Sequence, residues 1–174
     1  MLTLQKLEQA MPKLRHIKSN ERRVFDWHVL ARELGTGLPE DFMELAEWYP
    51  TFHIADFLVL SIPEPGQEVA YAQTWKDDQN LAALYADGLT YGYAPYPAPG
   101  GLIGWGASYE GDNFYWRTNE GDPNFWTIVV EGRNDDWCTY DGTLTDYLAG
   151  LATGTVTTDG LPSNFPGRDP VIDL

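Results

Sequence analysis

The chain has 174 residues, 43% of them hydrophobic and 14% aromatic, so it is long enough for one compact domain and too apolar for a disordered chain. With a formal net charge of −15, it is not expected to bind nucleic acid or an anionic membrane surface directly, because both require clustered cations. No apolar run approaches the roughly 18 residues of a membrane-spanning helix, so no such helix is predicted.

The N-terminal third of the chain is predicted to form three short helices. Apolar residues at three- and four-residue steps indicate the first helix, over residues 2–15. The second helix is expected to run from an N-cap at Asn20 to a stop at Gly35. The residues predicted for its buried stripe are Val24, Trp27, Ala31 and Leu34. A third helix is expected to begin near Pro39 and to end at the next proline.

The middle of the chain is predicted to contain a strand region and one more helix. Residues 52–62 are rich in apolar residues typical of strands, and a loop with many turn residues follows them. The helix is expected to start at Asp77 or Asp78 and to end near Ala86. The residues predicted for its apolar side are Leu81, Leu84 and Tyr85.

Short strands separated by Gly, Pro, Asn and Asp are predicted in the next segment, and such spacing favours antiparallel hairpins. Their expected ranges are 102–107, 113–117, 126–131 and 137–140. A last helix is expected between an N-cap at Thr143 and a stop at Gly154. Helices, then a meander of strands, then one helix predict an α+β fold: a single domain whose mostly antiparallel sheet packs with several helices.

The pattern also predicts how the domain is organised along the chain. Residues 1–20 are expected to form an N-terminal helical extension, and residues 21–154 the main domain. Residues 155–174 lack periodicity and are expected to form an irregular C-terminal tail.

The charges are distributed unevenly along the sequence. Residues 1–34 contain seven of the eleven Lys and Arg against four acids, whereas residues 35–174 contain four cations and 22 acids. The negative electrostatic field of these acids speeds the encounter with a basic protein and repels acidic competitors. Acidity can also serve solubility alone, so charge by itself leaves both interpretations open.

The cysteine content indicates where the protein works. Cys138 is the only cysteine, so the chain forms no internal disulfide. The first twenty residues include five charged side chains and no uninterrupted apolar block, which is unlike a secretory signal. A cytoplasmic protein of unknown oligomeric state is therefore predicted.

The sequence contains no motif that holds a metal or a phosphate cofactor. The three histidines lack the spacing of a zinc site, and no phosphate-binding loop occurs. No serine lies in a nucleophile elbow, although a dispersed triad stays open. We therefore predict no catalytic, cofactor-binding or metal-binding residue, and no cofactor.

Acids are the one type of catalytic residue in surplus. Seven acids fall within 32 residues: Glu110, Asp112, Glu120, Asp122, Asp135, Asp136 and Asp141, and all but Asp141 are the acids that we consider as contact residues. Two of these carboxylates could serve glycoside hydrolysis if one had a raised pKa and the other lay roughly 5–10 Å away. The stronger interpretation is that they belong to hairpin turns, because Gly-Asp and Asp-Pro pairs are typical of turns.

Tyrosines are concentrated in the segment YGYAPYPAPGG, which begins at Tyr91. Tyrosine offers a large contact area at a small entropic cost, so Tyr93 and Tyr96 are candidate partner-binding residues. The alternative is that the segment folds back and covers the domain.

Several short motifs follow one another along the chain: Glu33-Leu34-Gly35 after Trp27, LPEDF at 38–42, Trp48-Tyr49-Pro50, PAPGGLIGWGASYEGDNFYW at 97–116, Gly121-Asp122-Pro123, Trp126 to Val130, and Tyr140 to Leu148. In this order they resemble the SUKH superfamily, which includes the fungal Smi and Knr cell-wall regulators and many bacterial immunity proteins. The resemblance covers residues 24 to 154, and the order of the motifs carries it. The chain departs from the family pattern at Pro50, where Gly is common, and at Gly104, where Pro is common.

The resemblance implies that residues 21–154 are a SUKH-like domain without catalytic residues. It also implies that certain motif positions determine the fold. These are Trp27, Leu38, Pro39, Gly106, Gly111, Asp112, Trp116 and Trp126. Bacterial members resemble antidotes that bind and block a toxin, frequently a nuclease, whose active site attracts phosphate and is therefore basic.

We therefore expect a non-enzymatic immunity-type protein that binds a basic protein, a toxin domain, through its acidic and aromatic surface. The alternatives are a regulatory scaffold of the Smi or Knr type and, from another class, a carbohydrate-active enzyme that uses paired carboxylates. A toxin-bearing reading frame beside the gene would favour immunity over scaffolding.

Overall fold

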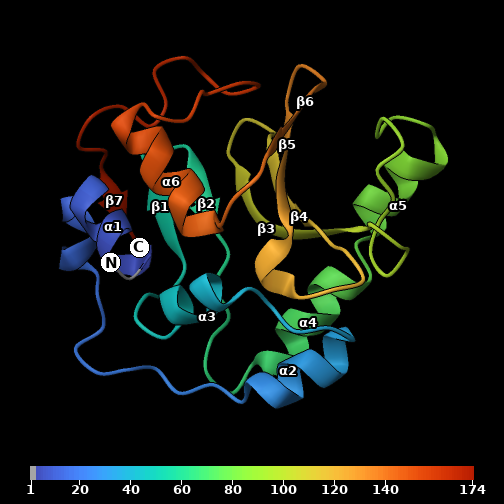
Figure 1. Ribbon diagram of the computed structural model, residues 1–174, viewed down its shortest axis with the longest axis horizontal. Helices are drawn as coiled ribbons and strands as arrows, with labels where there is room; N and C mark the ends of the chain where they lie inside the picture. The colour runs from blue at the N-terminus through green and yellow to red at the C-terminus, as the bar shows by residue number, and fades with distance from the viewer. Residues whose placement is uncertain (1–2) are drawn as a thin grey trace.

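The computed structural model describes residues 3–174, which form six α-helices, two short 3₁₀ helices and one seven-stranded sheet (Figure 1). The helices are α1 (Thr3–Ala10), η1 (Pro12–His16), α2 (Trp27–Leu34), α3 (Glu40–Ala46), α4 (Glu68–Lys76), α5 (Gln79–Ala86), η2 (Pro123–Phe125) and α6 (Leu144–Thr153). The strands are β1 (Phe52–Ile54), β2 (Leu58–Leu60), β3 (Leu102–Ser108), β4 (Asn113–Arg117), β5 (Thr127–Gly132), β6 (Asp136–Tyr140) and β7 (Ile172–Asp173). The predicted single-domain α+β fold is confirmed.

The sheet is antiparallel throughout, in the order β6-β5-β4-β3-β2-β1-β7. Strands that follow each other in the chain are neighbours, so β1 to β6 form a meander. The four predicted strands between residues 102 and 140 correspond to β3–β6. Turn residues between them fix where each strand ends, which is why their positions were predictable.

One face of the sheet packs against α3 and α6. Trp116 in β4 lies edge-on to Phe42 of α3, with ring centroids 4.9 Å apart. Trp105 in β3 lies 6.3 Å from Tyr147 of α6, and both tryptophans are almost fully buried. The main core of the protein therefore lies between this face and these two helices.

The other face of the central strands is buried as well. Leu102, Tyr115 and Val129, on β3, β4 and β5, pack with Leu81 of α5 in a second apolar cluster. Trp137 of β6 stacks against Tyr115 at its margin. Because both faces of β3–β5 are covered, the sheet offers no large free face to a partner.

The N-terminal segment belongs to the same core. The predicted helix over 2–15 is divided, because Pro12 lacks an N–H and begins η1 instead of continuing α1, while residue 2 lies outside the described residues. The apolar residues that predicted it are all buried: Leu4, Leu7, Met11 and Leu14. Helix α1 packs against α6, beside it in Figure 1.

The predicted start of α2 was wrong. The helix begins at Trp27, and Asp26 is its N-cap, with a carboxylate that accepts a hydrogen bond from the Val29 N–H. Val24, predicted for the buried stripe, is 80% exposed. The preceding segment is extended instead, because the Arg23 N–H donates to the Glu47 carbonyl. The predicted stop at Gly35 is confirmed, with φ at 92°.

Three further elements differ from the predictions. The strand region over 52–62 is a hairpin, β1 and β2, around a tight turn at Ala55 and Asp56. Helix α4 was predicted as a loop. Strand β7, predicted as irregular tail, pairs with β1 and joins the C-terminal segment to the sheet.

Gly104 allows α4 to approach the sheet. A Cβ at this position would collide with the indole ring of Trp75, which lies on the backbone of β3. Only glycine leaves room for this contact.

We expect Gly104→Ala to lower the free energy of unfolding by about 1–3 kcal/mol, because the added methyl group displaces Trp75 from a packed interface. Gly37→Ala is the matched control, since the nearest atom to its Cβ would be Pro123 Cγ at 3.8 Å. It should change stability by less than about 0.5 kcal/mol. Urea unfolding followed by tryptophan fluorescence measures both, and equal effects would contradict the packing argument.

A buried ionic contact fixes α1 to the rest of the domain. Glu8 Oε1 accepts hydrogen bonds from the Tyr49 hydroxyl at 2.8 Å and from Lys18 Nζ at 2.7 Å. Burial by itself raises the pKa of Glu8, but the hydrogen bonds from Lys18 and Tyr49 outweigh it and hold this pKa below its ordinary value. The ionised carboxylate therefore stabilises the folded protein.

We expect Glu8→Gln to lower the free energy of unfolding by about 1–3 kcal/mol at pH 7. Because the folded-state pKa of Glu8 is lowered, its contribution is present above the unfolded pKa and is lost as the pH falls through the folded value. The difference between the variant and the parent should therefore shrink below about pH 4. Urea unfolding at pH 7 and pH 3 measures it, with Glu21→Gln, on an exposed side chain, as the control. A difference independent of pH would contradict this role.

Candidate partner-binding surfaces

The predicted contact acids lie at two opposite ends of the sheet. Because the strands form a meander, the β3–β4 and β5–β6 turns share one end, which we call the hairpin end (residues 108–112 and 132–136). The β4–β5 connection lies at the other end, which we call the far end (residues 118–126). Glu110, Asp112, Asp135 and Asp136 are thus separated from Glu120 and Asp122 by the length of β4 and β5.

Asp112 stabilises the hairpin end from inside and is only 1% exposed. Its carboxylate accepts a hydrogen bond from the Arg133 N–H at 2.9 Å and another from the Ser108 hydroxyl. The same hydroxyl receives a hydrogen bond from the Asp112 N–H. Asp112 therefore connects the two turns and offers almost no surface to a partner.

The other acids of the hairpin end are exposed. Glu110 forms an ion pair with Arg133, whereas Asp135 and Asp136 have no cation within 4.0 Å among residues 3–174. Asp135 adopts a left-handed conformation, with φ at 63°, which Asp and Asn tolerate. Burial and the carboxylates of Asp159 and Asp136 raise the pKa of the Cys138 thiol, so negative charge also surrounds the adjoining part of β6.

The far end contains the other two candidates, and one of them has a local role. Asp122 is the N-cap of η2 and accepts a hydrogen bond from the Asn124 N–H at 2.9 Å. Asn124 in turn accepts one from the Glu40 N–H, which joins this connection to α3. Glu120 is exposed and makes no hydrogen bond or ion pair within the described residues.

The tyrosine-rich segment folds back over the domain. Tyr93 stacks on Trp137, with ring centroids 5.3 Å apart, and the guanidinium carbon of Arg117 lies over the Tyr93 ring, 5.7 Å from its centroid. Tyr96 packs against the main core, where its hydroxyl lies beside Gly35. Both rings are half-buried, so the segment covers the domain instead of projecting into solvent. Tyr91 is its most exposed tyrosine, at 71%.

Two exposed aromatic residues beside the candidate acids were not predicted. Tyr109 precedes Glu110 at the hairpin end and is 64% exposed, while Phe125 follows Asp122 at the far end and is 78% exposed. Each of the two lies between predicted strands, in a segment rich in turn residues. An aromatic residue inside such a predicted turn is the signal by which the sequence could have indicated an exposed ring. Each end of the sheet thus presents an aromatic ring together with carboxylates.

The cations of the chain are mostly engaged within the molecule. Eight of the eleven Lys and Arg form ion pairs, and these involve seven of the 26 acids. Of the others, Lys76 donates to the Glu33 carbonyl and Arg117 lies over Tyr93. Within residues 3–174, the other 19 acids have no cation within 4.0 Å, so the free charge of the surface is strongly negative.

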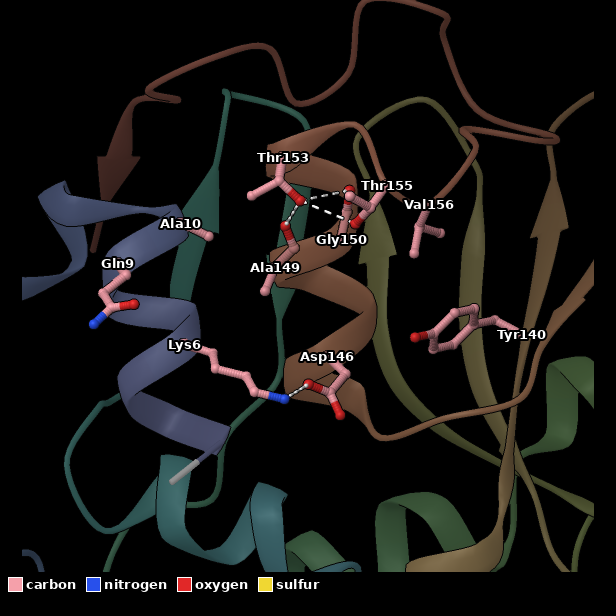
Figure 2. A pocket seen from close by; sticks show the side chains of 10 residues that line it. All are labelled: Lys6, Gln9, Ala10, Tyr140, Asp146, Ala149, Gly150, Thr153, Thr155 and Val156. Carbon is pink, nitrogen blue, oxygen red and sulfur yellow. Dashed lines mark hydrogen bonds and ion pairs between the residues drawn. The ribbon is translucent and has the colours of Figure 1, made fainter. Parts of the chain in front are cut away.

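A shallow groove of about 580 Å³ lies over the outer side of α6 (Figure 2). Lys6 of α1 and Asp146 of α6 form an ion pair on one side of it, and Tyr140 and Val156 lie on the other. Its walls mix charged, polar and apolar groups, and none of the predicted contact residues lines it. Among the described residues, no three His, Cys, Asp or Glu side chains are grouped as metal ligands, and no helix is long and apolar enough to cross a membrane.

Comparisons with known proteins identify no relative. No family model, no curated protein and no solved structure matches the chain. The resemblance to the SUKH superfamily therefore stays a prediction from the order of the motifs.

We expect Asp112→Ala to lower the free energy of unfolding by about 1–3 kcal/mol, because the Arg133 N–H and the Ser108 hydroxyl would lose their buried acceptor. Asp136→Ala, at the exposed first residue of β6, should change it by less than about 0.5 kcal/mol. Urea unfolding of the two variants separates a structural acid from a surface acid. A stability loss for Asp136→Ala as large as for Asp112→Ala would contradict the distinction.

Proposed function

We propose that this protein is a cytoplasmic, non-enzymatic immunity-type protein that binds and neutralises a basic toxin domain. The observation that carries the proposal is the distribution of charge. Nearly all cations are engaged inside the molecule, while 19 acids lack an ion-pair partner within the described residues. Such a surface accelerates association with a positively charged protein and disfavours acidic competitors.

The hairpin end supports the proposal best as the centre of contact. It combines exposed carboxylates at Asp135 and Asp136 with the exposed ring of Tyr109. Aromatic residues dominate the binding energy of many interfaces, and surrounding charges guide the encounter. Asp112 and its hydrogen bonds hold the two turns of this end together, so the contact side chains project from a rigid base.

The order of the SUKH-like motifs supports the same proposal from the sequence. In the proposed function, the chain blocks the toxin by covering its active site, and no residue of this chain takes part in a chemical step. A specific complex of this kind would bury about 1,200–2,000 Å² in total.

Growth rescue tests the proposed function. Cells that express the toxin domain encoded beside this chain's gene should stop growing, and co-expression of the chain should restore growth because the toxin is bound. Isothermal titration calorimetry with the purified toxin domain should show a complex of defined stoichiometry. A gene without such a neighbour, or toxicity unchanged by co-expression, would contradict the immunity proposal and favour a regulatory scaffold.

For that complex, we expect Asp135→Asn with Asp136→Lys to lower the association rate about tenfold at low salt, because local negative charge is lost. Asparagine at 135 preserves the left-handed conformation. The control, Glu21→Lys with Glu40→Gln, makes the same change in net charge away from the hairpin end, since Glu40 begins α3 beside the far end. Surface plasmon resonance at 50 and 300 mM NaCl measures both, and equal rates for the two variants would exclude the hairpin end as the contact.

A further inference from the structure

Strand β6 is an open edge of the sheet. It is the last strand in the order on one side, and its backbone pairs only with β5. Among residues 3–174, no other backbone or side-chain group forms a hydrogen bond with the backbone of residues 136–140. In an antiparallel ladder every second residue points its N–H and C=O away from the paired strand, so β6 presents a row of free donors and acceptors.

This edge has the charge of Asp136 but lacks other devices that usually protect an edge strand. Its sequence, DWCTY, contains no proline or lysine, and its pairing with β5 has no register shift. The C-terminal tail passes over it near Gly160 and Cys138, but against one face of the strand. In Figure 1 the β5–β6 hairpin projects at the top of the molecule, away from α2 and α4. The other edge, β7, has only two residues.

The charges around the edge favour a cationic occupant. Asp136 lies at one end of the strand and Asp141 directly beyond the other, about 17 Å apart along an extended chain. Both side chains are exposed, and neither forms an ion pair within the described residues. An added strand with a Lys or Arg near each end would therefore meet a carboxylate at each end.

The same charges disfavour a second copy of this chain. Antiparallel pairing of two β6 strands about a twofold axis at Cys138 would place Asp135 of each copy opposite Asp141 of the other. Like charges directly opposite each other destabilise a strand pair, and each copy adds a net charge of −15.

We propose that β6 is a docking edge where an extended, cationic segment of the partner protein adds an eighth strand to the sheet. This inference rests on the proposed function for the sign of the partner's charge, and it adds the mode of binding. Backbone hydrogen bonds of the new strand supply affinity, and the carboxylates at the two ends select its charge. Trp137 and Thr139, on one face of β6, and Cys138, on the other, would contact its side chains.

A designed peptide tests the docking edge without the toxin. The probe is the six-residue peptide Lys-Thr-Val-Thr-Val-Lys, whose lysines have the spacing of Asp136 and Asp141 and point to opposite faces of a strand. Its control carries the same side chains with every second backbone nitrogen methylated, which removes donors and keeps the charge. The unmodified peptide should bind the full chain at least tenfold more tightly at 50 mM NaCl, as measured by fluorescence anisotropy. Hydrogen exchange of the outward amides of β6 should slow at saturation.

Variants of the protein locate the contact. Asp136→Lys with Asp141→Lys should weaken binding of the unmodified peptide at least tenfold, whereas Glu21→Lys with Asp173→Lys, which changes the net charge equally, should weaken it less than threefold. Equal binding of the two peptides, no binding of either, or unchanged exchange in β6 would overturn the docking edge. Growth rescue by the chain despite that result would leave the proposed function intact, so the two failures are distinguishable.

Discussion

The burial of β3, β4 and β5 on both faces is the constraint that shapes the rest of this molecule. One face is covered by α3 and α6 around Trp105 and Trp116, and the other by α5 and the folded-back segment that contains Tyr93. A sheet covered in this way cannot bind a partner on a broad face. What it leaves accessible are its two ends and its free edge, where the exposed rings of Tyr109 and Phe125 lie together with several exposed acids.

The elements that local signals determine could be predicted from the sequence. Thr143 and Gly154 delimit α6 as expected, because a side-chain cap and a left-handed glycine specify the ends of a helix within a few residues. The strands β3–β6 could be predicted equally well, since turn residues separate them. The start of α2 was not, because Asn20 and Asp26 are both good caps and only the contact between Arg23 and Glu47 decides between them.

Elements that depend on tertiary contacts escaped prediction. Helix α4 buries Tyr71 and Ala72 but leaves most of its surface exposed, so its apolar pattern is weak. Strand β7 has two residues and exists through its pairing with β1. The separation of the candidate acids into two ends was within reach of the sequence, because alternate turns of a meander lie at opposite ends. The burial of Asp112 was not, since it depends on the backbone of a turn 21 residues away.

The acids of the hairpin end therefore differ in role although they are alike in sequence. The carboxylate of Asp112 satisfies buried donors, and that of Glu110 neutralises Arg133. Only Asp135 and Asp136 are left with their charge free toward solvent. A structural acid and a contact acid can thus lie within the same turn pair, and substitutions that ignore the difference would confuse loss of folding with loss of binding.

Charge and backbone make separate contributions to recognition in such a molecule. At physiological ionic strength the field of one surface charge decays over about 8 Å, so most of the 19 unpaired acids act on the rate of approach and not on the final contact. A field that is negative over most of the surface cannot by itself specify where a partner binds. A row of unpaired backbone groups can, because its hydrogen bonds form at one register and in one direction. In the proposed complex, the free edge of β6 supplies the position that the charge distribution alone leaves undefined.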